Sequence, residues 1–313
     1  METRKLGRSD IAIAPLVLGG NVFGWTADEA TSFSILDAFV DAGFNAIDTA
    51  DVYSRWSPAG AGASERVIGA WLKASGKRDK VVIATKFGME MAEDRKGLSA
   101  KWMKKAVEDS LTRLRTDHID LYQAHRDDLD TPQEETGEAF ASLVSAGKVR
   151  AIGASNFDAA RLISANALAE KNGWPRYETL QPLYNLYDRV AFEGELAAAC
   201  AAEGIAVIPY YGLASGFLTG KYRSEADLAQ SPRGRGAKKY LTERGRRILA
   251  DLDAVGARLT ATPAQVALAW LMAKVTAPIA SATSVAQLGE LLAAADLKLD
   301  AEAVAELDAA SAP

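Results

Sequence analysis

The chain has 313 residues, of which 49% are hydrophobic and 25% charged, and its formal net charge is -5. These values are ordinary for a globular protein, and charges without long single-sign blocks argue against nucleic acid as a partner. The length permits one large α/β barrel or two ordinary domains.

The N-terminal segment has no long apolar run before a cleavage site, and no window approaches the roughly 18 apolar residues that a membrane span requires. We therefore expect a cytoplasmic protein without a membrane partner. The chain has one cysteine, Cys200, within an alanine-rich run, which excludes an internal disulfide framework and a Cys-x-x-Cys metal knuckle. Cys200 is interpreted as a small residue in a helix core.

Short β-rich apolar runs alternate with helical patterns along almost the whole chain. Residues 1–14 precede them and are predicted to form a hairpin with a glycine-containing turn at the bottom of a barrel. Eight strands are predicted, at residues 16–19, 44–48, 80–86, 118–125, 149–155, 177–181, 205–210 and 277–281.

Helical periodicity marks the segments between the strands, and several begin with Ser, Thr or Asp or end at Gly, as helix caps require. The predicted helices lie within residues 27–43, 64–75, 98–114, 131–148, 158–171, 193–204 and 262–274. Residues 222–240 are polar, lack a hydrophobic period and are predicted to form a long functional loop.

This alternation favours an α/β fold of the (β/α)8 TIM barrel type, with the N-terminal β-hairpin at the bottom, long βα loops and a single domain over residues 1–313. A doubly wound dinucleotide-binding domain is the competing interpretation. That fold requires a G-x-G-x-x-G run directly after a strand, and the chain has none.

Polar residues at the carboxyl ends of the predicted strands are the candidates for catalysis, because barrels of this type place their active site there. Asp48 ends one strand, Tyr53 follows five positions later, Lys86 ends the next strand and His125 ends the third. Each alone could be a cap, a loop anchor, a solvated strand end or a core imidazole. Together they converge on one mouth from consecutive strands.

This set suits proton donation to a carbonyl oxygen. A tyrosine of ordinary pKa ~10 is a weak acid at neutral pH, and a nearby ammonium lowers its pKa. Lys86 is predicted to be that ammonium, and Asp48 is predicted to pair with it. His125 is predicted to donate a hydrogen bond to the carbonyl and orient it.

A series of segments in fixed order and spacing resembles the aldo-keto reductase superfamily over nearly the whole chain. They are DTADVYS (48–54), GASE (62–65), TKFG (85–88), HIDLYQAH (118–125), GASN (153–156), LQPLYN (180–185) and GFLTGKY (216–222). The resemblance implies an NADP(H)-dependent oxidoreductase that transfers a hydride to a small-molecule aldehyde or ketone. It also implies that Asp48, Tyr53, Lys86 and His125 are the catalytic residues, with Tyr53 as general acid.

The same resemblance implies a set of cofactor contacts. Ser155, Asn156 and Gln181 would hold the nicotinamide carboxamide, and Tyr210 would stack on its ring. Leu213, Gly216 and Leu218 would lie under the pyrophosphate, where small residues and backbone amides can approach it, and Gly20 and Asn21 would form the floor of the substrate and nicotinamide pocket. Asp48 and residues near the last strand would add further contacts. Besides Asp48, the additional positions are Gly20, Asn21, Leu213, Gly216, Leu218, Lys221, Ser281, Thr283 and Gln287. No metal ion is expected.

One departure from the family bears on the choice of cofactor. Members that prefer NADP carry an arginine for the 2'-phosphate in a G-A-R pattern and a later asparagine for the adenine, whereas this chain has Ser281-Ala282-Thr283-Ser284 and Leu291. Thr283, Ser284 and Gln287 could supply hydrogen bonds instead. The positive charge could come from Lys221, Arg233 or Lys238 on the long loop. NADP(H) is expected, with NAD(H) as the alternative.

Two other functions stay open from the sequence. A cofactor-binding regulatory barrel of the same fold would not catalyse a reaction, and the intact set of four residues argues against it. A metal-dependent barrel hydrolase or lyase needs several ligands at strand ends, but the chain has only two histidines, and His118 begins its strand on the face away from the chemistry. Trp25 and Trp56 are candidates for lining the substrate pocket. Substrate and oligomeric state are not predicted.

Overall fold

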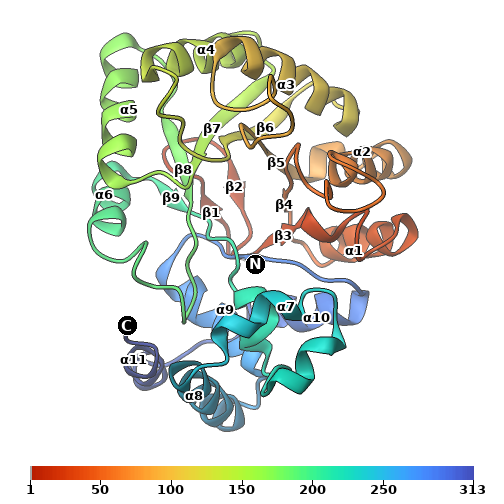
Figure 1. Ribbon diagram of the computed structural model, residues 1–313, viewed down its shortest axis with the longest axis vertical. Helices are drawn as coiled ribbons and strands as arrows, with labels where there is room; N and C mark the ends of the chain where they lie inside the picture. The colour runs from red at the N-terminus through yellow and green to blue at the C-terminus, as the bar shows by residue number, and fades with distance from the viewer. Residues whose placement is uncertain (1) are drawn as a thin grey trace.

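The computed structural model describes residues 2–313, and these residues form the barrel that the sequence predicts (Figure 1). Eight parallel strands in this part of the chain make one sheet, and each lies within a predicted run except β5, which extends one residue beyond its run. Their bounds are β3 Val17–Gly19, β4 Ala46–Asp48, β5 Val82–Phe87, β6 Ile119–Ala124, β7 Val149–Ser155, β8 Tyr177–Gln181, β9 Ala206–Val207 and β10 Ile279–Ala280.

The sheet closes on itself. Its order is β10-β3-β4-β5-β6-β7-β8-β9, so the first and last strands of the order must meet to complete a barrel. They do so through backbone hydrogen bonds, because the Ile279 amide donates to the Pro209 carbonyl over 2.9 Å and the Ala277 amide donates to the Val207 carbonyl over 3.3 Å. All eight strands therefore direct their carboxyl ends to the same rim.

The seven predicted helices are present, and α1 to α6 follow one another around the strands in Figure 1. Side-chain caps fix several of their starts, as where Asp28 accepts from the Thr31 amide and Asp158 accepts from the Arg161 amide. Their bounds are α1 Glu29–Asp41, α2 Ala63–Ser75, α3 Ala100–Leu114, α4 Gln133–Ser145, α5 Ala159–Asn172, α6 Glu195–Glu203 and α9 Pro263–Lys274.

Four α-helices of the described residues were not predicted: α7 Gly234–Ala237, α8 Glu243–Leu259, α10 Val285–Ala293 and α11 Ala301–Ala310. The segment 222–240 is thus not a loop throughout, since it contains η4 (Glu225–Gln230), α7 and η5 (Lys238–Tyr240). Three further short 3-10 helices are η1 Gly20–Val22, η2 Arg78–Lys80 and η3 Ala214–Thr219. No helix formed by residues 2–313 is long and apolar enough to cross a membrane. That residues 1–313 are one domain stays a prediction.

The N-terminal hairpin, β1 (Arg4–Lys5) and β2 (Ala12–Ile13), closes the bottom of the barrel as predicted. Its apolar side chains join the inward-facing residues of the strands in one buried cluster, which contains Leu6, Ile11, Ile13, Val17, Ala46, Val82, Ala84, Leu121, Ala151, Ala206, Ile208, Ala277 and Ile279. Asn45, just before β4, fixes the hairpin by accepting from the Ala14 amide and donating to the Ala12 carbonyl.

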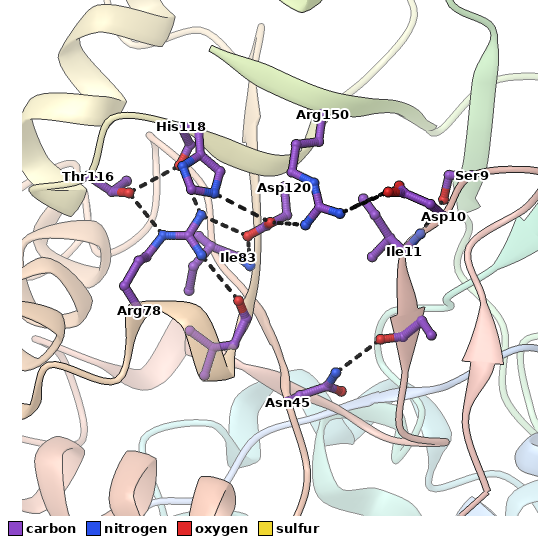
Figure 2. A network of polar contacts seen from close by, with 12 residues as sticks. Ser9, Asp10, Ile11, Asn45, Arg78, Ile83, Thr116, His118, Asp120 and Arg150 are labelled. Atoms are coloured by element: carbon purple, nitrogen blue, oxygen red, sulfur yellow. Dashed lines mark hydrogen bonds and ion pairs between the residues drawn. The ribbon is translucent and has the colours of Figure 1, made fainter. Parts of the chain in front are cut away.

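A network of ion pairs surrounds Asp120 at the same end of the barrel (Figure 2). Asp120 is buried near the start of β6 and accepts from Arg78 Nη2, Arg150 Nη1 and the Ile83 amide, each over 2.8 Å. Arg150 also reaches Asp10 of the hairpin at 3.4 Å. His118 lies beside this network, at the end of β6 opposite His125, which confirms that it is far from the predicted catalytic face.

Replacing Asp120 by alanine is expected to lower the free energy of unfolding by roughly 3 to 5 kcal/mol, because it leaves Arg78 partly buried without its counter-charge. Urea denaturation measures this. Asp117 is the control: it pairs with His118 and is 93% exposed, so its replacement by alanine should change stability by less than about 1 kcal/mol. Equal effects of the two substitutions would contradict a buried structural role for Asp120.

Candidate active site

A cavity of about 1130 Å³ opens at the rim formed by the carboxyl ends of the strands. Its volume lies slightly above the roughly 300 to 1,000 Å³ that is usual for small-molecule and cofactor sites. Most residues predicted for catalysis or cofactor binding line it: Asn21, Asp48, Tyr53, His125, Ser155, Asn156, Gln181, Tyr210, Leu213, Gly216, Lys221, Ser281, Thr283 and Gln287. Gly20, Lys86 and Leu218 lie behind the wall.

Asp48 and Lys86 form the predicted ion pair at the floor of the cavity. Both are buried, and Lys86 Nζ lies 2.6 Å from Asp48 Oδ2 and 2.7 Å from the Thr49 carbonyl oxygen. Gln181 Nε2 donates to the other carboxylate oxygen over 2.9 Å. Burial alone would lower the pKa of Lys86, but the carboxylate of Asp48 raises it above its ordinary value, so the ammonium stays charged.

Tyr53 lies directly beside this pair. It is half-buried, and the centre of its ring is 4.8 Å from Lys86 Nζ. Burial raises the pKa of Tyr53 to about 12, while Lys86 pulls it down and Asp48 pushes it up. Lys86 therefore has the predicted lowering effect, but the net pKa is raised, because desolvation of the phenolate outweighs the attraction of one ammonium that is already paired. At neutral pH the hydroxyl keeps its proton.

His125 meets Tyr53 edge to face, with ring centres 5.9 Å apart. Burial, together with the charges of Lys86 and Arg126, holds the pKa of His125 well below its usual range, so the imidazole is neutral. Its Nδ1 is buried without a hydrogen-bond partner among residues 2–313. His125 also lines the cavity, so its other ring nitrogen is the one that can meet a group bound there.

A second set of polar residues extends from this centre along the rim. Ser155 Oγ donates to the Gln181 carbonyl oxygen over 2.8 Å, and Asn156 Nδ2 donates to Ser155 Oγ and to the His125 carbonyl oxygen. Tyr210 Oη donates to Asn156 Oδ1 over 2.8 Å. Asn156 has a left-handed backbone (φ 55), which asparagine tolerates better than most residues. The hydrogen bonds hold the side chains of Ser155, Asn156 and Tyr210 in one arrangement next to His125.

Comparison with known proteins decides the family. The model of the Aldo/keto reductase family matches residues 15–312. The chain belongs to this family. It is 38% identical to an uncharacterized oxidoreductase of Bacillus subtilis, YrpG, over 96% of this chain and 93% of the relative. It is 32% identical to the protein tas of Escherichia coli over 99% and 97%, and 33% identical to the norsolorinic acid reductase stcV of Emericella nidulans over 95% and 78%.

Members of the aldo/keto reductase family are oxidoreductases that act on small carbonyl compounds with nicotinamide cofactors. The cavity of this member has room for a long ligand, because it continues from the Tyr53 end towards β10 and α10. There Ser281 Oγ donates to Asn21 Oδ1 over 2.7 Å, and the amide and hydroxyl of Thr283 both donate to Gln287 Oε1. Within residues 2–313, no group of three or more His, Cys, Asp or Glu side chains is placed to hold a metal ion.

The three basic residues that were considered for binding a 2'-phosphate differ in where their side chains lie. Lys221 and Arg233 line the cavity, and neither takes part in an ion pair among the described residues. Arg233 is half-buried, and burial lowers its pKa below the ordinary arginine value. Lys238 instead lies on the surface and pairs with Glu225 at 3.2 Å.

Gly20 and Leu218, which were predicted to contact the cofactor, lie behind the cavity wall and affect the shape of the cavity indirectly. A Cβ on Gly20 would lie 3.0 Å from the Asp48 carbonyl oxygen and 2.9 Å from Ser64 Oγ, so only glycine fits there. Leu218 has a fully buried side chain, and its amide donates to the Leu213 carbonyl. Leu218 therefore supports the turn that carries Gly216, at φ 89, along the cavity wall.

Two buried acids beside β5 were missed from the sequence. Glu65 accepts from Thr85 Oγ1 and pairs with Arg113 Nε, both over 2.6 Å. Asp51 is buried with no hydrogen-bond partner for its side chain among residues 2–313, and burial, reinforced by Glu65, raises its pKa well above the usual range. Both residues occur in the segments that carry the family resemblance, but sequence alone does not show that they are buried.

Proposed function

We propose that the chain is an NADP(H)-dependent carbonyl reductase that converts an aldehyde or ketone to the alcohol, with Tyr53 as the proton donor. The observation that supports this best is the buried Lys86–Asp48 pair beside a protonated Tyr53 and a neutral His125 that lines the cavity. An intact acid, a charged lysine and a free imidazole at one point of a cavity favour turnover over a purely regulatory role.

Each of these residues has a distinct part in the proposed reaction. His125 donates a hydrogen bond to the carbonyl oxygen and orients it. Tyr53 Oη gives its proton to that oxygen as the C–O double bond is reduced to a single bond. Lys86, held by Asp48, then stabilises the phenolate that remains. Bound NADPH supplies the hydride to the carbonyl carbon.

The residues present fit a nicotinamide cofactor. Ser155, Asn156 and Gln181 offer hydrogen bonds for a carboxamide, and the ring of Tyr210 beside them offers a face for stacking. Asn21, Ser281, Thr283 and Gln287 line the distant part of the cavity, where the adenosine would lie. Together these contacts would hold the dinucleotide along the whole rim.

Arg233 and Lys221 are proposed as the residues that favour the 2'-phosphate, in place of the family's absent arginine. Both side chains line the cavity, and neither has an ion-pair partner among residues 2–313. A guanidinium that is already partly desolvated loses little hydration when a phosphate binds. Arg233 lies within the segment 222–240 and Lys221 directly precedes it, which agrees with the function predicted for that segment.

Calorimetric titration of the protein with NADPH and with NADH tests the cofactor preference by comparing the two Kd values. NADPH is expected to bind at least about tenfold more tightly, because a charge-assisted hydrogen bond contributes about 1.5 to 3 kcal/mol. Arg233→Gln should remove most of that preference, while the control Lys238→Gln, outside the cavity, should keep it. If NADH binds wild type as tightly as NADPH, the phosphate assignment is wrong.

A further inference from the structure

The mouth of the cavity next to Tyr53 is lined by large apolar side chains. Trp25 and Trp56 pack edge to face with ring centres 5.4 Å apart, and Val52 and Met89 line the same cavity. Trp56 keeps 51% of its surface exposed. An exposed indole held in place by a second indole at the edge of a pocket is a surface for a flat apolar ligand.

Arg55, between Tyr53 and Trp56 in sequence, brings a positive charge to this mouth. Its side chain lines the cavity, and Nη1 donates to the Glu90 carbonyl oxygen over 2.6 Å. No ion pair among residues 2–313 includes Arg55. One hydrogen bond to a neutral oxygen positions the guanidinium but leaves most of its five donors, and all of its charge, free for a ligand.

The other charges of the wall do not neutralise Arg55. Two acids line the cavity, and Asp48 is already paired with Lys86. Glu290 lies on α10 at the distant end, where it accepts from Thr262 Oγ1 over 2.8 Å. The reacting end of the cavity therefore carries a positive charge that attracts anions.

We propose that the substrate is a carbonyl compound with a flat apolar body and a carboxylate or similar anionic group, the body resting on Trp56 and the anion held by Arg55. The planar guanidinium matches a carboxylate in a two-point contact. This proposal rests on the proposed function, because it assigns the substrate class of the same site.

Kinetics with two aldehydes of nearly equal shape test the proposal. In 4-carboxybenzaldehyde and 4-nitrobenzaldehyde, the group opposite the aldehyde is planar in both but charged only in the first. Arg55→Gln is expected to raise KM for 4-carboxybenzaldehyde about tenfold or more and to raise KM for 4-nitrobenzaldehyde at most about twofold, since only the first loses a charge-assisted contact. Added salt should raise KM of wild type for the carboxylate alone.

Arg66→Gln is the matched control. Arg66 is also exposed, lies on the same part of the chain and donates only to backbone carbonyls, those of Ala59 and Ala61, but it does not line the cavity. The variant Arg66→Gln should leave KM for both aldehydes unchanged. If Arg55→Gln changes KM equally for both aldehydes, or changes neither, the anion site is wrong. Turnover of 4-nitrobenzaldehyde would in that case still support the proposed function. Absence of NADPH oxidation with every aldehyde would overturn the proposed function itself.

Discussion

Replacing Tyr53 by phenylalanine is expected to lower kcat for carbonyl reduction by about 100-fold to 10,000-fold, the range that a positioned general acid contributes. The substitution removes the proton donor and keeps the ring that packs against His125 and Lys86. Since the pKa of Tyr53 is raised to about 12, the wild-type phenol is fully protonated at neutral pH, and the whole population of enzyme is competent to donate. Steady-state NADPH oxidation with an aldehyde measures the loss.

The Kd for NADPH should change little in the same variant, because the proposed cofactor contacts lie on other residues. Tyr187→Phe serves as the control: it also removes one phenol hydroxyl, here bonded to Thr242 Oγ1, and it lies outside the cavity. Its kcat should remain close to wild type. A Tyr53→Phe enzyme with near-normal turnover would refute Tyr53 as the acid.

Most strands of the barrel could be predicted because they are apolar runs buried on both faces, a pattern that can be recognised without knowledge of the neighbouring strands. The segment 82–87, buried at all six positions, is an example. Helix α8 was missed although Ile248, Leu249, Leu252 and Val255 form a buried stripe. Its first turns are rich in charge and follow a polar segment, so the stripe is visible mainly once α9 and α11 are known to pack against it.

The positions of the four proposed catalytic residues could likewise be predicted, because strand ends of a parallel barrel meet at one rim. The protonation states of these residues could not be predicted. The sequence places an ammonium near a phenol, but the net pKa of Tyr53 depends on how much water both groups lose and on the carboxylate that already neutralises Lys86. The free charge of Arg55 was also not predicted, since a sequence does not show which arginines lack an acidic partner.

These energetics change how Lys86 should be understood. An ammonium that fails to lower the pKa of Tyr53 below its ordinary value can still stabilise the phenolate formed after proton transfer, relative to the same buried phenol without a cation. The Lys86–Asp48 pair is then a fixed counter-charge for the product state of Tyr53. Its presence matters most at the moment when the proton has left.

Lys86→Met is therefore expected to lower kcat by about 100-fold or more, and it should also destabilise the fold by roughly 3 to 5 kcal/mol, because Asp48 remains as a buried carboxylate without a cation. Urea denaturation and steady-state kinetics measure the two effects. Lys77→Met is the control, since Lys77 pairs with the exposed acids Asp37 and Asp41 and should change stability by about 1 kcal/mol or less, with normal kcat.

A double variant separates the two roles of Lys86. In Asp48→Asn with Lys86→Met, no uncompensated charge remains, and the amide oxygen of the new asparagine can still accept from Gln181. Stability should recover by most of the loss, whereas kcat should stay low because the phenolate of Tyr53 has no counter-charge. Recovery of activity together with stability would mean that Lys86 acts only on the fold, and a double variant as unstable as Lys86→Met would mean that Asp48 is not the group left without a partner.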